Sequence, residues 1–114
     1  LVQRGDRDAA LKAYMDLRNA DPENMATKEQ ILNSEGYRLM TDGMLQQARD
    51  LFYINMKLYP KSSNVYDSYA EASLKLGDKR EALIHYRRAA AMDPNNSNAA
   101  RIASELEKDG RVAN

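Results

Sequence analysis

The chain lacks cysteine and has a single histidine, His85, among its 114 residues. Without thiols there are no disulfides, no thiolate metal ligands and no cysteine nucleophiles. A catalytic role for His85 would need a nucleophile and an orienting acid around it, and the local sequence supplies neither. There is also no glycine-rich phosphate loop and no metal-ligand spacing. We therefore expect no catalytic residue, no cofactor and no metal site, and we expect His85 to be a partly exposed surface side chain.

The chain also lacks an excess of charge of either sign, because 17 Lys and Arg balance 17 Asp and Glu. Charge-driven nucleic-acid binding needs a surplus of basic residues to neutralise phosphates, so we expect no nucleic-acid partner. No apolar run approaches the ~18 residues of a membrane span. The absence of cysteine suits the cytoplasm and the periplasm equally, so the compartment stays open.

Proline is scarce, and its three positions reveal an internal repeat. Each proline lies eight residues after an aromatic, each aromatic four after an alanine, and each alanine five after a glycine. The second and third copies are offset by 34 residues and the first and second by 38, which places a four-residue insertion between Pro22 and Leu32. Three copies of one pattern indicate a repeat architecture. The members are Gly5, Ala10, Tyr14 and Pro22; Gly43, Ala48, Phe52 and Pro60; and Gly77, Ala82, Tyr86 and Pro94.

This pattern predicts pairs of helices. Gly43 and Gly77 follow helical stretches and suit the positive φ that ends a helix. An alanine and an aromatic four residues apart share one helix face, and proline prevents the second helix from continuing. No stretch alternates like a strand. The expected helices are residues 6–20, 27–41, 44–58, 63–76, 78–91 and 96–109, with Ser62 or Ser63 and Asn96 or Ser97 as N-caps.

With these features the chain resembles the tetratricopeptide repeat (TPR) family. One repeat carries its signature at Leu32, Gly36, Leu39, Ala48, Phe52 and Pro60, and the next at Tyr66, Tyr69, Ala70, Ala82, Tyr86, Ala89 and Pro94. Glu35, Asn55 and Ser73 depart from the family pattern. The resemblance implies an all-α, right-handed α-solenoid of about six helices in antiparallel hairpins. It implies a single domain over residues 1–114, divided into a half repeat at 1–22, repeats at 29–62 and 63–96, and a capping helix at 97–110.

A narrower resemblance involves Leu32-Asn33-x-x-Gly36-Tyr37 and the segment from Tyr59-Pro60 to Asp67-Ser68. These residues are similar to the C-terminal TPR tail of bacterial serine hydrolases of the β-lactamase-like or esterase-like kind. The likeness implies an accessory module whose enzyme domain, with all catalytic residues, lies outside this chain. The alternative is a free-standing adaptor that binds an extended peptide in its concave groove.

Family positions on the concave face give the candidate binding residues. They are slightly acidic as a set, and the Lys/Asn/Arg constellation with which some TPR proteins hold a peptide carboxylate is incomplete. A solvated polar face without a partner is the competing interpretation. The residues are Asn33, Tyr37, Met40, Asp67, Glu71, Lys75, Arg101 and Glu105.

The first helix lacks an upstream partner helix, so Tyr14 and Leu17 are predicted to lie on an open-end face. A preceding domain, a further repeat or a second copy of the chain would cover it, and we expect a homodimer of the isolated chain. Tyr37, Tyr53 and Tyr59 fall off the core stripe and are candidates for a contact surface. Asn55 replaces a small apolar residue on an inward face, so we expect its amide to be hydrogen-bonded to a neighbouring first helix.

Overall fold

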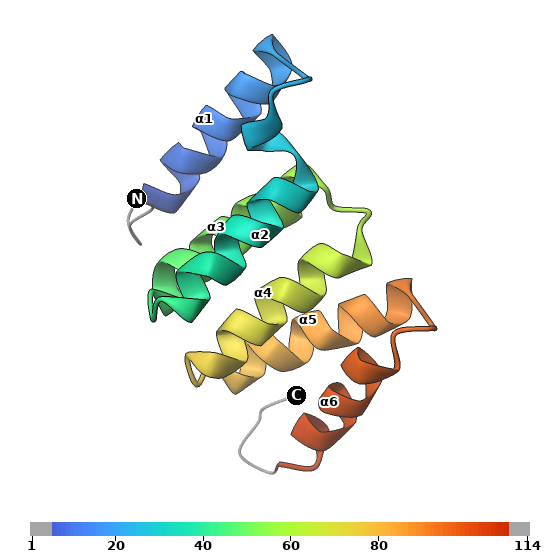
Figure 1. Ribbon diagram of the computed structural model, residues 1–114. Helices are drawn as coiled ribbons and strands as arrows, with labels where there is room; N and C mark the ends of the chain where they lie inside the picture. The colour runs from blue at the N-terminus through green and yellow to red at the C-terminus, as the bar shows by residue number, and fades with distance from the viewer. Residues whose placement is uncertain (1–5, 110–114) are drawn as a thin grey trace. The chain divides into compact units, whose positions relative to one another are not determined.

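A computed structural model describes residues 6–109, and these residues form six α-helices and one short 3₁₀ turn (Figure 1). This is the expected all-α architecture of adjacent helical hairpins. The glycine of the first repeat copy, Gly5, lies outside the described residues. The elements are α1 (Arg7–Ala20), η2 (Met25–Thr27), α2 (Glu29–Thr41), α3 (Leu45–Leu58), α4 (Ser63–Lys75), α5 (Lys79–Met92) and α6 (Ser97–Glu107).

The chain divides into two compact units, Leu1–Pro60 and Lys61–Asn114. In unit 1, α2 packs along α3, and α1 packs against α3. In unit 2, α5 packs against both α4 and α6. Each unit therefore contains one complete helical hairpin and one additional helix. The assignment of all 114 residues to one domain stays a prediction.

Glycine makes the tight turn inside each hairpin. Gly43 has a φ of 81° and Gly77 a φ of 85°, the left-handed conformation that the sequence predicted. After α2, the Gly43 amide donates to the Met40 carbonyl at 3.1 Å and the Met44 amide to the Leu39 carbonyl at 2.9 Å. These two hydrogen bonds satisfy carbonyl groups in the last turn of α2 that would otherwise lack a donor.

The prolines stand just beyond the helices that they end. Helices α1, α3 and α5 stop at Ala20, Leu58 and Met92, two residues before a proline in each case. Asn96 caps α6 as expected, because its Oδ1 accepts a hydrogen bond from the Ala99 amide at 3.0 Å. Ser62 occupies the N-cap position of α4, as expected, but its side chain makes no capping hydrogen bond there.

The small and aromatic repeat residues form the cores, as the pattern predicted. In unit 2 the core contains five alanines, which allow the three helices to approach closely around Leu83 and Tyr86. In unit 1 a core of Leu32, Leu51, Ile54 and Leu58 lies under α1, and Tyr14 packs against it. The core residues of unit 2 are Ala70, Ala82, Leu83, Tyr86, Ala89, Ala99, Ala103 and Leu106.

Asn55 shows how a polar residue fits such a core. Its side chain is 1% exposed, and its Nδ2 donates to the Glu29 carbonyl of α2 at 3.1 Å. The predicted hydrogen bond to a neighbouring first helix is confirmed. Within the described residues, its Oδ1 is buried and accepts no hydrogen bond. One half of this amide therefore ties α3 to α2, and the other half carries a desolvation cost.

Candidate functional site

Helix α4 presents a row of charged side chains at one-turn intervals: Asp67, Glu71 and Lys75. Asp67 and Glu71 are partly buried, whereas Lys75 is exposed. Residues four apart lie on the same face of a helix, so the three form one stripe. Asn96 Nδ2 donates to Asp67 Oδ2 at 3.2 Å, so the residue that caps α6 also ties the start of this stripe to α6.

Burial raises the pKa of the Asp67 carboxyl above its usual value, and the nearby Glu71 charge raises it further. The hydrogen bond from Asn96 acts in the opposite direction and lowers the pKa of Asp67, but it does not compensate for the burial. A carboxylate with a raised pKa is one whose negative charge is poorly balanced by its surroundings. A cationic group from a partner would supply the missing balance.

The charges on α6 balance each other. The Arg101 guanidinium donates to both carboxylate oxygens of Glu105 at 3.1 Å and to the Asn98 side chain at 2.9 Å. The side chains of Arg101 and Glu105 are each 60% exposed. Surface pairs of this kind contribute about 0–1 kcal/mol, so their main effect is to hold the two side chains in place.

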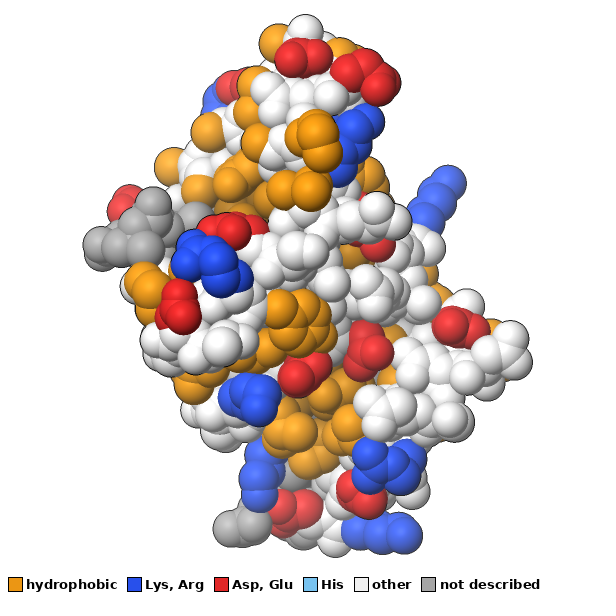
Figure 2. Space-filling model, viewed as in Figure 1, with side chains coloured by type: hydrophobic (Ala, Val, Ile, Leu, Met, Phe, Trp, Pro, Cys, Tyr) orange, Lys and Arg blue, Asp and Glu red, His pale blue; other side chains and the backbone are white. Residues whose placement is uncertain are grey.

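Apolar surface accompanies these charges in unit 2. Leu74 of α4 and Ile102 of α6 are only partly buried, and both pack against the unit 2 core. In the region of α4 and α6, Figure 2 shows hydrophobic side chains exposed between acidic and basic ones. We name the set Asp67, Glu71, Leu74, Lys75 and Ile102 the α4–α6 surface. Partly buried carboxylates and partly buried apolar side chains are therefore both present in this set.

The three candidate residues of unit 1 differ from one another. Asn33 and Tyr37 are partly buried, and the Tyr37 ring packs edge-on against Phe52 with 5.1 Å between centroids. Met40 is only 9% exposed, so its assignment to an accessible binding face was wrong. The physical reason is its register: Met40 follows Leu32 and Gly36 at intervals of four, and all three lie on the buried stripe of α2.

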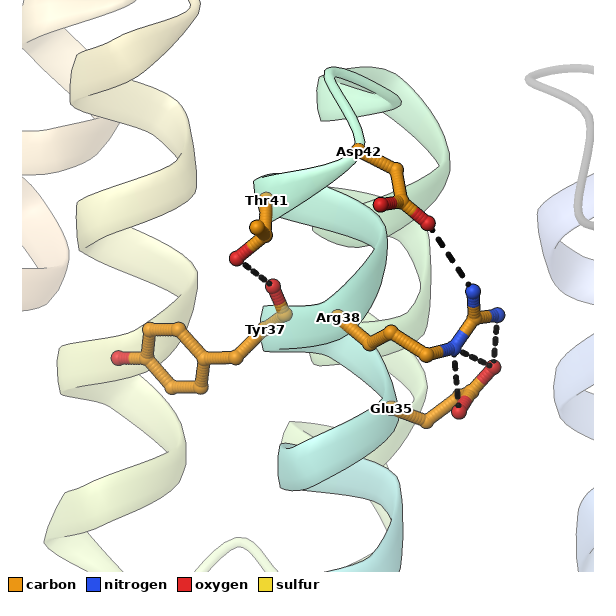
Figure 3. A network of polar contacts seen from close by, with 5 residues as sticks. All are labelled: Glu35, Tyr37, Arg38, Thr41 and Asp42. Atoms are coloured by element: carbon orange, nitrogen blue, oxygen red, sulfur yellow. Dashed lines mark hydrogen bonds and ion pairs between the residues drawn. The ribbon is translucent and has the colours of Figure 1, made fainter.

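A charged network that the sequence analysis missed occupies the other side of α2. Figure 3 shows Tyr37 projecting away from a cluster of Glu35, Arg38 and Asp42. Arg38 Nε donates to both oxygens of Glu35 at 3.1 Å, and Arg38 Nη1 to Asp42 Oδ2 at 3.1 Å. The hydrogen bond from Arg38 lowers the pKa of Glu35. The spacing of opposite charges at three and four residues was the available signal.

Tyr14 and Leu17, the two residues predicted to lie on the open-end face, differ in how they are covered. Leu17 is 36% exposed, and Met15 beside it is 42% exposed. Tyr14 instead packs inward against the unit 1 core, and burial, followed by the charge of Glu35, raises the pKa of its hydroxyl. No residue of α1 is fully buried. Leu17 therefore contributes to exposed apolar surface on α1, whereas much of Tyr14 is covered by its own unit.

The other two off-stripe tyrosines contact cations and the backbone. Arg7 lies 3.9 Å from the Tyr53 ring centroid and Lys57 lies 5.4 Å from it. The Tyr59 hydroxyl donates to the Thr27 carbonyl. Both rings are partly buried.

His85 lies in unit 2, where its side chain is partly buried. Its Nδ1 donates to the Glu81 carbonyl at 2.9 Å, and its ring meets Tyr69 edge-on at 4.6 Å between centroids. Over residues 6–109, no three His, Asp or Glu side chains group as metal ligands. No helix among the described ones has the length and apolar character needed to cross a membrane.

Residues 63–96 match the family model of the tetratricopeptide repeat. This segment, less than half of the chain, is similar to one tetratricopeptide repeat. It begins with α4 and ends at the cap of α6, so it carries Asp67, Glu71 and Lys75. No curated protein sequence matches the chain.

The fold is also similar to a solved structure, the crystal structure of MamA protein, with a TM-score of 0.63 and 24% sequence identity. The match covers 90% of this chain and 54% of the MamA chain, so the chain spans about half the length of that protein. At this identity, the likeness supports the helical-hairpin fold alone.

Proposed function

We propose that this chain is a non-catalytic protein–protein interaction module. The observation that carries the proposal is the tetratricopeptide repeat at residues 63–96, because repeats of this class present a packed helical surface to other proteins. The α4–α6 surface is the contact area that we assign to the repeat. Apolar area at Leu74 and Ile102 would supply affinity, and the unbalanced acid at Asp67 would favour a partner with a basic residue.

We further propose that the module is the C-terminal accessory domain of a larger bacterial protein such as a serine hydrolase. The support is the similarity of Leu32–Tyr37 and of the segment from Tyr59 to Ser68 to such enzyme tails. Under this proposal, catalysis belongs to another domain. The rival is a free-standing adaptor that holds an extended peptide.

Charge reversal on α4 tests the interaction. The unmodified chain is first used to capture a partner from an extract of the organism that makes it, and quantitative mass spectrometry identifies that partner. The variant Asp67→Lys/Glu71→Lys should no longer capture it. The matched control is Asp8→Lys/Asp16→Lys, which makes the same change of net charge at two exposed positions on α1. Equal capture of that partner by both variants would remove the α4–α6 surface from the proposal.

The intact mass of the native gene product distinguishes an accessory domain of a hydrolase from a free-standing adaptor. A product some tens of kDa heavier, with a Ser-x-x-Lys or Gly-x-Ser-x-Gly motif upstream, would support the hydrolase module. A product extended only by further repeats would support the adaptor. Hydrolytic activity that stays with the purified chain and disappears in His85→Ala would overturn the non-catalytic proposal in both versions.

A further inference from the structure

Helix α1 occupies the same place in the repeat pattern as α3 and α5, but three of its repeat residues are less well covered. In α3 and α5 each of these three positions is at most 2% exposed. In α1, Ala10 and Tyr14 are only partly buried, and Leu17 is 36% exposed. The equivalent residues are Ala48, Phe52 and Asn55 in α3, at an offset of 38, and Ala82, Tyr86 and Ala89 in α5, at a further 34.

The first helix of each complete hairpin covers these positions. Gly36 of α2 lies directly against the Phe52 ring, so close that an added Cβ would overlap the ring. The Asn55 side chain donates to a carbonyl at the start of α2 at 3.1 Å. In unit 2, Ala70 of α4 belongs to the same core as Tyr86. The element that α1 lacks within residues 6–109 is therefore a helix of the α2 and α4 type, with a small residue at the position of Gly36 and Ala70.

Helix α6 is a helix of this type, and the corresponding side of it is uncovered. Ser104 lies 34 residues after Ala70, which itself lies 34 after Gly36, so the three share one register position. Gly36 and Ala70 are buried, whereas Ser104 and Ala100, one turn before it, are exposed. Within the described part of the chain, no helix follows α6 to cover them. Helix α6 therefore presents the half of a hairpin that α1 lacks.

The two helices are also complementary in charge. Helix α1 carries three basic and two acidic side chains, a net charge of +1, and α6 carries one basic and two acidic side chains, a net charge of −1. Opposite net charges favour association of the two helices over association of either helix with its own copy. Covering Leu17 would also remove apolar surface from water.

We infer that α6 of one copy of this chain packs against α1 of a second copy and completes a hairpin between them, with Ser104 against the Tyr14 ring. A second copy is the occupant because this chain itself supplies both halves of the hairpin in matching register. The contact joins two different faces, so each added copy leaves one α1 and one α6 free, and association continues beyond a dimer. Ala100 and Ser104 are not part of the α4–α6 surface, so the contact does not depend on the proposed function.

Two variants that each block one face test the contact. Leu17→Glu places a charge on the α1 face, and Ser104→Arg places a long side chain where the Tyr14 ring should lie. In sedimentation velocity over a concentration series, the unmodified chain should form species larger than a dimer, and each variant alone should stay monomeric. An equimolar mixture of the two variants should form a heterodimer and grow no further, because only one intact pair of faces remains. Both positions are exposed, so both variants should keep the circular dichroism of the unmodified chain.

The matched controls make the same two changes elsewhere. Ile84→Glu on α5 and Ser34→Arg on α2 alter exposed positions and should associate like the unmodified chain. An unmodified chain that is monomeric at every concentration, a mixture of variants that stays monomeric, or a loss of association in either control would overturn the contact. Association that stops at a dimer and survives Ser104→Arg would instead indicate a symmetric α1–α1 contact and would also overturn it. Each of these outcomes leaves partner capture by the α4–α6 surface as a separate question with its own test.

Discussion

The contact between Gly36 and Phe52 gives the sharpest stability prediction. An alanine Cβ at position 36 would lie 2.7 Å from both Cδ1 and Cζ of the Phe52 ring and closer still to Cε1. Phe52 is only 1% exposed, and its ring is held against Tyr37, so it cannot swing away into solvent. Overpacking of this kind costs about 1–3 kcal/mol. Alanine returns about 0.5–1 kcal/mol because it favours the helix over glycine.

Because three atoms of the buried Phe52 ring lie too close to the added Cβ, we expect the upper part of the overpacking cost. Gly36→Ala should therefore lower the free energy of unfolding by about 1–2 kcal/mol, or the melting temperature by about 4 °C per kcal/mol. Urea unfolding followed by circular dichroism measures this. The control is Ser34→Ala, an exposed position on the same helix, which should change stability by no more than about 0.5 kcal/mol. Adding Phe52→Leu should recover part of the loss, with a coupling of about 1 kcal/mol. A Gly36→Ala chain as stable as the unmodified one would refute the argument.

Three further predictions follow from single contacts. Asn55→Asp replaces the donor to the Glu29 carbonyl with a buried charge, so it should destabilise the chain by about 3 kcal/mol at neutral pH and by less in acid. Asn55→Ala should change stability by about 1 kcal/mol or less, and urea unfolding at two pH values checks both variants. Because the pKa of Asp67 is raised on folding, the contribution of Asp67 to stability falls as the pH rises above the usual pKa of 3.8. Asp67→Asn should therefore stabilise the chain slightly at pH 7 and not at pH 3, and it should also weaken partner binding. Tyr59→Phe should cost about 1 kcal/mol in thermal unfolding, because the Thr27 carbonyl loses its donor; an unchanged melting temperature would contradict this.

The helices and their buried faces were predictable because the repeat residues determine them through local chemistry. Gly43 and Gly77 adopt positive φ at the turns, and Phe52 and Tyr86 are buried four residues after fully buried alanines. Each of these outcomes depends on spacing along one helix or on the conformational range of one residue type. Such constraints can be read from the sequence without knowing which helix packs against which.

The surfaces were harder to predict, because exposure depends on what the neighbouring helices cover. The family resemblance placed Met40 among the binding residues, yet it is buried on the stripe of α2 that begins at Leu32. Asn96 was predicted only as a cap, but its amide also reaches Asp67 from a helix that begins 30 residues further along the chain. Contacts between separate helices leave no periodic trace in the sequence.

The residues that depart from the repeat pattern differ in exposure: Asn55 and Ser73 are buried, whereas Glu35 is exposed. The residues that fit the pattern, such as Ala48, Ala82 and Ala89, have no exposed surface, so they can specify the fold but cannot touch a partner. Glu35 departs from the pattern, and the structure places it in an exposed network with Arg38 instead of in a core. The insertion departs from the period and exposes Met25. Two modules with the same buried residues would therefore share a fold and differ in their partners. Restoring the 34-residue spacing by deleting four residues around Met25 should accordingly leave the helix content intact, which circular dichroism can check.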